Sequence, residues 1–197
     1  MWPAIYNFVC IVTAVSCCAF AIKLADDYLD QEQDRLTGQA NWTDILGIGT
    51  MFYAIFFISI AAAIHSSVSL SLFFASYIVG MFNDFKNRFP LGLTGWQESS
   101  LTLLLCLVLF GWEMTFFSLA FVIAVQLIDD CIDIKIDSKS GRRNFACRLG
   151  CMECSLAALL ALLFAWWLIE ALFFPVLTGI VLVYGGLLQW TPVKNYV

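Results

Sequence analysis

Residues 24–41 read LADDYLDQEQDRLTGQAN, and residues 127–144 read LIDDCIDIKIDSKSGRRN. Aligned at one constant offset, these two aspartate segments share a leucine, four aspartates, a glycine and an asparagine. If the chain is helical here, the aspartates of each segment recur about one turn apart along one stripe. The first segment contributes Asp26, Asp27, Asp30 and Asp34, and the second contributes Asp129, Asp130, Asp133 and Asp137.

The rest of the chain is strongly apolar. Of the 197 residues, 61% are hydrophobic and the mean hydropathy is +0.86, whereas soluble domains are nearer ~45–50% apolar. A span needs ~20 apolar residues, and seven segments come close or qualify: about 2–24, 44–64, 66–82, 98–111, 114–129, 152–170 and 171–190. Breaks at IHSSVS (64–69), GWEM (111–114) and EALFFP (170–175) separate pairs of them. We predict an all-α, polytopic transmembrane bundle of about seven spans, forming one membrane domain over 1–197.

The charged residues are unevenly distributed. Nine of the fifteen acidic residues fall in the aspartate segments, so the net charge of −5 says little about partners. With seven spans, all ten Lys and Arg residues lie on one side, which the positive-inside rule makes cytoplasmic. We therefore expect a multi-pass protein in a lipid bilayer, with both aspartate segments and the C-terminus on the cytoplasmic side. No nucleic-acid partner is expected.

An internal repeat extends beyond the aspartates. FNDFKNRF (82–89) and WTPVKNYV (190–197) share a Lys-Asn pair. Each half, about 1–97 and 98–197, thus reads as a span, an aspartate segment, two spans and Lys-Asn. This order predicts two parallel pseudo-repeats, an arrangement that some membrane folds use.

Clustered carboxylates at helix ends repel one another unless a counter-charge is present. Hard divalent cations prefer carboxylate oxygens, and Mg²⁺ usually keeps positions for water and substrate phosphates. We therefore predict a magnesium site formed by all eight aspartates and open to a diphosphate. Basic side chains nearby could donate hydrogen bonds to the same anion: Lys23, Lys86, Arg88, Arg142, Arg143 and Lys194.

These motifs resemble those of the UbiA-type intramembrane prenyltransferase superfamily. Its hallmark is N-D-x-x-D-x-x-x-D after one helix and D-x-x-x-D after a later one, and the FKNR segment (85–88) is a further likeness. Asp26 falls at the family's Asn, Asp27, Asp30 and Asp34 fall at its aspartates, and Asp129, Asp133 and Asp137 match the second motif. The resemblance implies that these residues ligate magnesium and that Lys86 and Arg88 contact a prenyl diphosphate.

The resemblance also implies a reaction, in which an isoprenoid chain passes from the diphosphate to a lipophilic or aromatic acceptor. Asp30, Asp133 and Lys86 would be the catalytic residues. The chain departs from the family in Asp26 and in its length, since nine helices are usual. Seven spans could enclose the cavity alone, or a second copy could complete it as a homo-oligomer.

Other functions compete with this one. A membrane terpene cyclase would ionise the same substrate but close the cation on its own double bonds. A CDP-alcohol phosphotransferase would need D-G-x-x-A-R, which neither aspartate segment has. A divalent-cation transporter would use carboxylates along an ion path. The spacing Cys147, Cys151 and Cys154 also occurs in some iron–sulfur sites.

Overall fold

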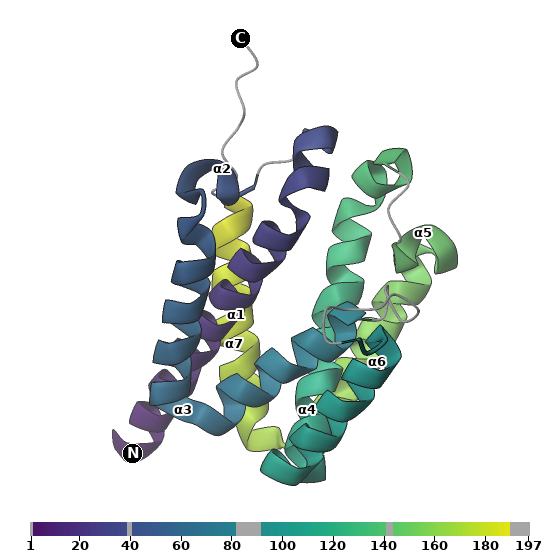
Figure 1. The fold of residues 1–197 in the computed structure, drawn as a ribbon. Coiled ribbons are helices and arrows are strands. Elements are labelled where there is room, and N and C mark those ends of the chain that lie inside the picture. The colour runs from purple at the N-terminus through teal and green to yellow at the C-terminus, as the bar shows by residue number, and fades with distance from the viewer. Residues whose placement is uncertain (1, 39–40, 82–91, 141–143, 190–197) are drawn as a thin grey trace. The chain divides into compact units, whose positions relative to one another are not determined.

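The computed structural model describes residues 2–38, 41–81, 92–140 and 144–189 (Figure 1). All of the secondary-structure elements in these ranges are helices, which confirms the prediction of an all-α protein. The elements are α1 (Trp2–Thr37), α2 (Thr43–Leu46), α3 (Gly49–Gly80), α4 (Gly95–Ser140), α5 (Phe145–Leu149), α6 (Cys151–Leu168) and α7 (Glu170–Gln189).

Four helices in the described ranges are long and apolar enough to cross a membrane: Pro3–Glu32, Gly49–Gly80, Gly95–Ile134 and Cys151–Leu168. Their most apolar windows have mean hydropathies of 1.9 to 2.2, and only 17% to 39% of each window is buried inside the protein. Most of this apolar surface therefore faces outward, where lipid is a favourable environment and water is not. These helices identify an integral membrane protein, as the composition predicts.

Two of the long helices are interrupted at single residues. His65 in α3 has φ −151° and ψ 84°, and Gly111 in α4 has φ 78° and ψ 170°, neither of which is helical. Both breaks lie where the sequence predicts a turn, and the junction of α6 and α7 at Ile169 adjoins the third predicted break. Because α3 and α4 can each also be taken as one long span, the count of seven spans stays a prediction.

Hydroxyl groups satisfy carbonyls at both breaks. Ser69 Oγ donates to the carbonyl of Ala61 at 3.0 Å, reaching back across His65. Thr115 Oγ1 donates to the Gly111 carbonyl at 2.7 Å. A break in a helix leaves carbonyls without their usual amide partner, and in lipid no water replaces it. The Ser69 hydroxyl therefore supplies a donor to a carbonyl that precedes the break at His65, which stabilises that bend.

The chain packs as two compact units. Unit 1 comprises Met1–Leu70 and Phe174–Val197, and unit 2 comprises Ser71–Phe173. Unit 1 thus contains α1, α2, most of α3 and most of α7, whereas unit 2 contains the end of α3 with α4, α5 and α6. Each unit consequently draws helices from both predicted halves of the sequence. The C-terminal end of α3, from the first half, lies in unit 2, and most of α7, from the second half, lies in unit 1.

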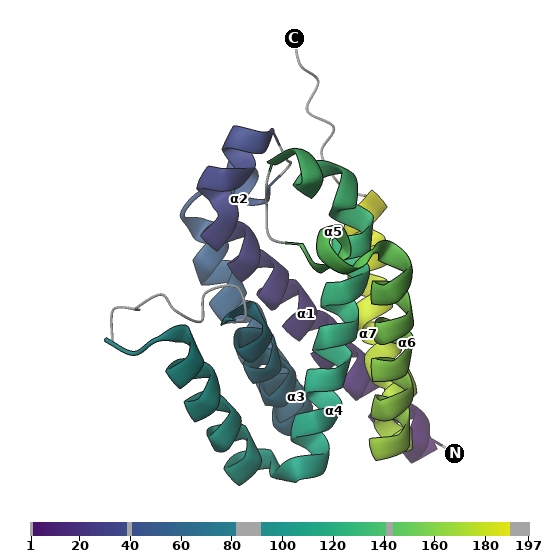
Figure 2. The same ribbon diagram turned by 90° about the vertical axis from the view of Figure 1, so that its right-hand side faces the viewer.

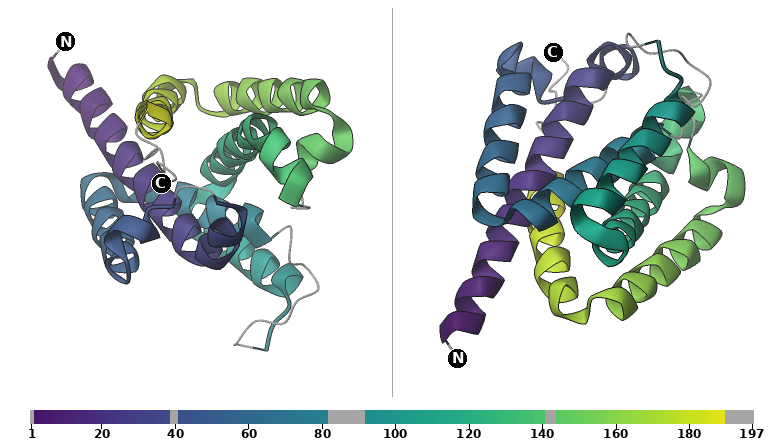
Figure 3. Two further views of the ribbon diagram at one scale, coloured as in Figure 1. Left: turned by 90° about the horizontal axis from the view of Figure 1, so that it is seen from above. Right: turned by 60° about the horizontal axis from the view of Figure 1, so that its bottom comes forward.

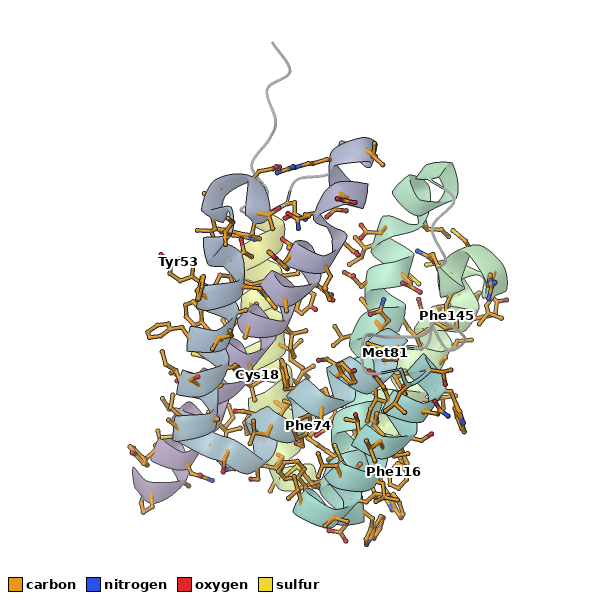
Figure 4. The ribbon with its side chains drawn as sticks, viewed as in Figure 1. Cys18, Tyr53, Phe74, Met81, Phe116 and Phe145 are labelled. Carbon is orange, nitrogen blue, oxygen red and sulfur yellow. The ribbon has the colours of Figure 1, made fainter. Side chains whose placement is uncertain are left out.

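In unit 1, α1 runs as one uninterrupted helix into the first aspartate segment (Figure 3). Cys18 lies midway along it (Figure 4), and its thiol donates to the Ser69 carbonyl of α3 at 3.2 Å. The Phe20 ring meets the Phe57 ring edge to face, with centroids 4.9 Å apart. These contacts hold α1 against α3 through buried and half-buried side chains.

A glycine lets α7 approach α1 closely. A Cβ atom at Gly179 would lie 2.8 Å from the Cβ of Val15, which is too close for two carbon atoms. Ser16 Oγ donates to the Gly179 carbonyl at 3.2 Å. Small residues at such crossings allow the close backbone approach on which helix association in membranes depends.

Unit 2 is built around α4, which doubles back on itself at its break (Figure 2). The second arm packs against α5 and α6. It also contacts the end of α3, where Ser118 Oγ donates to Ser71 Oγ at 2.8 Å between two buried side chains. Phe117 and Phe121 are fully buried in the same arm, and the Phe121 ring lies 5.3 Å from that of Phe173.

Candidate functional site: two aspartate segments

Both aspartate segments continue the helix that precedes them. α1 extends to Thr37 and α4 extends to Ser140, so the aspartates lie on helical surfaces, as their spacing predicts. The burial of the side chains divides the first four, however. Asp26 and Asp30 are exposed, whereas Asp27 is only 5% exposed and Asp34 only 6%. The predicted stripe is therefore two faces, one outward and one turned into unit 1.

The buried Asp27 holds the chain that follows α1. Its Oδ1 lies 3.1 Å from the Nζ of Lys23, one helical turn earlier. Its Oδ2 accepts a hydrogen bond from the backbone N–H of Trp42 at 3.0 Å, fifteen residues later. Both carboxylate oxygens thus have partners within the first segment and its flanking residues.

Asn41, which follows α1 in the chain, makes further hydrogen bonds back to that helix. Its Nδ2 donates to the Asp27 carbonyl and to Asp34 Oδ2, both at 2.7 Å. Its Oδ1 accepts from the N–H of Thr43 at 2.7 Å and from the Thr43 hydroxyl at 2.6 Å. The amide is 3% exposed and uses both its donors and its acceptor. Asn41 therefore joins α1 to the start of α2.

The second segment makes the same contacts with different neighbours. Asp130, 7% exposed, accepts from Gln126 Nε2 at 3.2 Å and from the N–H of Phe145 at 2.7 Å. Asn144, 2% exposed, donates from Nδ2 to the Asp130 carbonyl at 2.8 Å and accepts from the N–H of Cys147 at 3.0 Å. Phe145 marks the start of α5 beside this contact (Figure 4).

The likeness continues past the two asparagines. Gly47 and Gly150 end α2 and α5, both with positive φ (54° and 103°). Each donates its N–H four residues back, to Thr43 at 2.9 Å and to Ala146 at 3.0 Å. Gly47 and Gly150 have the same offset as the aspartates but lie beyond the aligned stretches 24–41 and 127–144, so the predicted repeat did not include them. The two asparagines were predicted only as shared residues, without a role.

The outward carboxylates form one pair in each unit. Asp26 and Asp30 are exposed on α1, and Asp129 and Asp133 are partly exposed on α4. Each pair offers hard oxygen donors one helical turn apart, which suits Mg²⁺, an ion commonly held by one or two carboxylates with water and phosphate oxygens. Asp137 lies in α4 near its C-terminal end. Among the described residues, no group of three or more acidic, His or Cys side chains is placed to hold a metal by itself.

The predicted diphosphate-binding residues lie mainly beyond the described ranges. Lys86, Arg88, Arg142, Arg143 and Lys194 fall outside them. Lys23 is described, and its ammonium group forms the ion pair with Asp27. At the end of α1, Arg35 lies 3.8 Å from Asp44 of α2, an exposed pair worth ~0.2–1 kcal/mol.

Cys147 lies in α5, Cys151 and Cys154 lie on the first turn of α6, and all three are free thiols. Cys147 and Cys151 are exposed, and Cys154 is buried. Cys131 of α4 donates to the Cys151 carbonyl at 3.4 Å, so the thiols lie at the contact of α4 with α6. Of the three, only Cys154 is buried in unit 2.

The two segments thus offer similar chemistry: an outward carboxylate pair for a hard cation, on a helix end held by a buried aspartate and asparagine. The pairs lie where membrane-length apolar helices end, within or just past the apolar ranges that close at Glu32 and Ile134. Such a position gives access both to an anionic head group in water and to an apolar chain in lipid. A scan against protein-family models and searches of curated proteins and of solved structures found no match to this chain.

Proposed function

We propose that the protein is a magnesium-dependent intramembrane prenyltransferase of the UbiA type. It would ionise a prenyl diphosphate and transfer the isoprenoid chain to a lipophilic or aromatic acceptor. The observation that carries the proposal is the repeated local structure of the aspartate segments. Two helix ends in one chain present an acidic pair next to an apolar span, and the same hydrogen bonds hold both.

The proposed fold follows the same repeat. We take the order α1, α2 and α3 and the order from the second arm of α4 through α5, α6 and α7 as two parallel pseudo-repeats of about seven spans. The turns support this assignment, because His65 (φ −151°, ψ 84°) and Ile169 (φ −143°, ψ 82°) have nearly the same conformation. The aspartate segments and the C-terminus would then be cytoplasmic.

The roles of the residues follow from the reaction. Asp26, Asp30, Asp129 and Asp133 would hold magnesium, which, when bound, stabilises the departing diphosphate. The allylic C–O bond breaks, and its electron pair leaves with the diphosphate. Lys86 and Arg88 would donate hydrogen bonds to that anion as its charge develops. The allylic cation then forms a bond to the acceptor, which loses a proton.

Turnover of labelled prenyl diphosphates of several chain lengths tests the proposal, with reconstituted protein, Mg²⁺ and a membrane extract as the source of acceptor. We expect Asp30→Asn and Asp133→Asn each to lower the rate by about a hundredfold or more. Glu32→Gln is the matched control, since Glu32 is an exposed acid on the same turns of α1 outside the motif. It should retain the wild-type rate.

The product separates the alternatives. A prenylated acceptor supports the transferase. A cyclic hydrocarbon or alcohol released without any acceptor would assign a terpene cyclase instead. Magnesium flux into liposomes that contain no prenyl substrate, without any turnover, would point to a transporter and sink the enzymatic proposal.

A further inference from the structure

Asp27 and Asp130 differ from the outward aspartates in being buried, and both oxygens of each carboxylate accept from donors of the protein. Each gives one oxygen to a side-chain donor one turn earlier and the other to a backbone N–H fifteen residues later. Each is at most 7% exposed. The side-chain donor is Lys23 in one segment and Gln126 in the other, so the arrangement does not depend on a particular cation.

We propose that Asp27 and Asp130 are positioning residues, each acting with Asn41 or Asn144, and that they are not ligands of the metal. This inference rests on the proposed function. It changes the expected magnesium ligands from every aspartate of the motifs to the outward ones, and it gives the two asparagines a role in the site.

The contacts explain why a ligand role is unfavourable. To bind magnesium at ~2.0–2.1 Å, an oxygen of Asp27 or Asp130 would have to turn toward the ion and away from its present donor. The backbone N–H of Trp42 or Phe145 would then lose its acceptor in a partly buried place. Asp30, by contrast, is exposed, and the acceptors of these two N–H groups are Asp27 and Asp130.

The same contacts explain how the outward pair of aspartates is positioned. In the first segment, Asn41 binds both the Asp27 carbonyl and the Asp34 carboxylate, seven residues apart on the buried face of α1. The adjoining, exposed side of these turns carries Asp26 and Asp30. Helix C-termini fray because their last carbonyls lack amide partners. Holding the buried face therefore fixes the geometry of the outward pair.

Magnesium-dependent binding of inorganic diphosphate to the reconstituted full chain tests the inference by calorimetry. The readout is the Mg²⁺ concentration at half-saturation. Asp130→Asn keeps an acceptor oxygen for the Phe145 N–H, and Gln126 can turn its amide to suit, so we expect a value within about threefold of the wild type. Asp130→Ala should raise it about tenfold, and Asp133→Asn by at least as much. A ligand would behave differently, since Asp130→Asn and Asp133→Asn would then be equally damaging.

The asparagine supplies the matched variant. Asn144→Ala should act like Asp130→Ala, and the double variant should be no worse than either, because both act through one contact. Additive effects, or an Asn144→Ala value equal to that of the wild type, would overturn the inference. Amide exchange at Phe145 gives a check without ligand: it should accelerate in Asp130→Ala but not in Asp130→Asn.

The outcomes also separate this inference from the proposed function. If the wild type binds magnesium diphosphate but turns over no prenyl diphosphate, the transferase is wrong and the positioning roles stand on the binding data. If the wild type binds no magnesium diphosphate, there is no site to position and the inference fails, whatever the turnover assay shows.

Discussion

Asn41 is the residue whose loss should damage the first aspartate segment most. Its amide makes four hydrogen bonds in a place that is 3% exposed. Asn41→Ala would leave the Asp27 carbonyl and the Asp34 carboxylate without this donor, at a cost of ~1–3 kcal/mol for each buried group. We expect the unfolding free energy in detergent to fall by ~2–4 kcal/mol.

Asn7 provides the control for that substitution. It is an exposed asparagine on the same helix, so Asn7→Ala should change the stability by no more than ~0.5 kcal/mol. Equal effects of the two substitutions in chemical unfolding would show that the buried hydrogen bonds of Asn41 contribute nothing.

For single residues, the sequence predicted that the aspartates follow one another along a helix. It did not predict which of them are buried and which are exposed. Spacing of 100° per residue places Asp26, Asp27, Asp30 and Asp34 within about one quarter to one third of the helix circumference. Which of them turn inward depends on what packs beside α1, and that partner, Asn41, lies beyond the helix. The alignment marked Asn41 and Asn144 as shared, yet a shared residue does not reveal that its amide reaches back fourteen residues.

For the helices, the break in α4 gives a direct test. Gly111 has φ 78° and ψ 170°, a conformation that only glycine adopts readily. A Cβ there would meet no atom within 4 Å, so Gly111→Ala tests backbone strain without a steric clash. We expect a loss of ~1–3 kcal/mol in unfolding free energy.

Gly185→Ala is the matched control for Gly111→Ala. Gly185 lies inside α7, and a Cβ there also meets nothing within 4 Å. Alanine is the better helix former by ~1 kcal/mol, so this variant should be as stable as the wild type or more stable. A stable Gly111→Ala protein would mean that the two arms of α4 can join as one continuous helix.

The sequence located the breaks well because polar or glycine residues interrupt long apolar runs. It could not assign helices to units. α3, α6 and α7 are apolar around most of their circumference, so no stripe marks the face that meets a neighbour. The crossing of α1 and α7 depends on a single glycine, Gly179, and one missing side chain leaves no periodic signal.

For the whole molecule, the number of spans decides on which side of the membrane Lys86 and Arg88 lie. With seven spans, His65 and Gly111 are turns on the far side, and Lys86 and Arg88 share the cytoplasmic side with the aspartates. With four spans, taken as the four candidate helices, α3 and α4 would cross once each, and Lys86 and Arg88 would lie on the side opposite the aspartate segments. A glycosylation tag inserted beside Lys86 should therefore stay unmodified, and one inserted after Trp112 should be modified. The reverse pattern would refute the seven-span topology.

Each compact unit contains helices from both halves of the sequence, so we predict that neither half is stable without the other. Unit 1 needs α7, whose Gly179 carbonyl binds Ser16 of α1, and unit 2 needs the end of α3, whose Ser71 binds Ser118. Fragments 1–97 and 98–197 should therefore be degraded when each is expressed alone and should co-purify when expressed together.

One substitution in the second fragment tests whether this association depends on the crossing of α1 and α7. A leucine at Gly179 would collide with Val15, whereas one at Gly186 would meet no atom within 4 Å at its Cβ. Overpacking of this kind costs ~1–3 kcal/mol or more in an intact chain, and separate fragments have no covalent link to offset it. Gly179→Leu should therefore abolish co-purification and Gly186→Leu should preserve it. Two fragments that are each stable alone and never associate would show that the halves fold as independent domains.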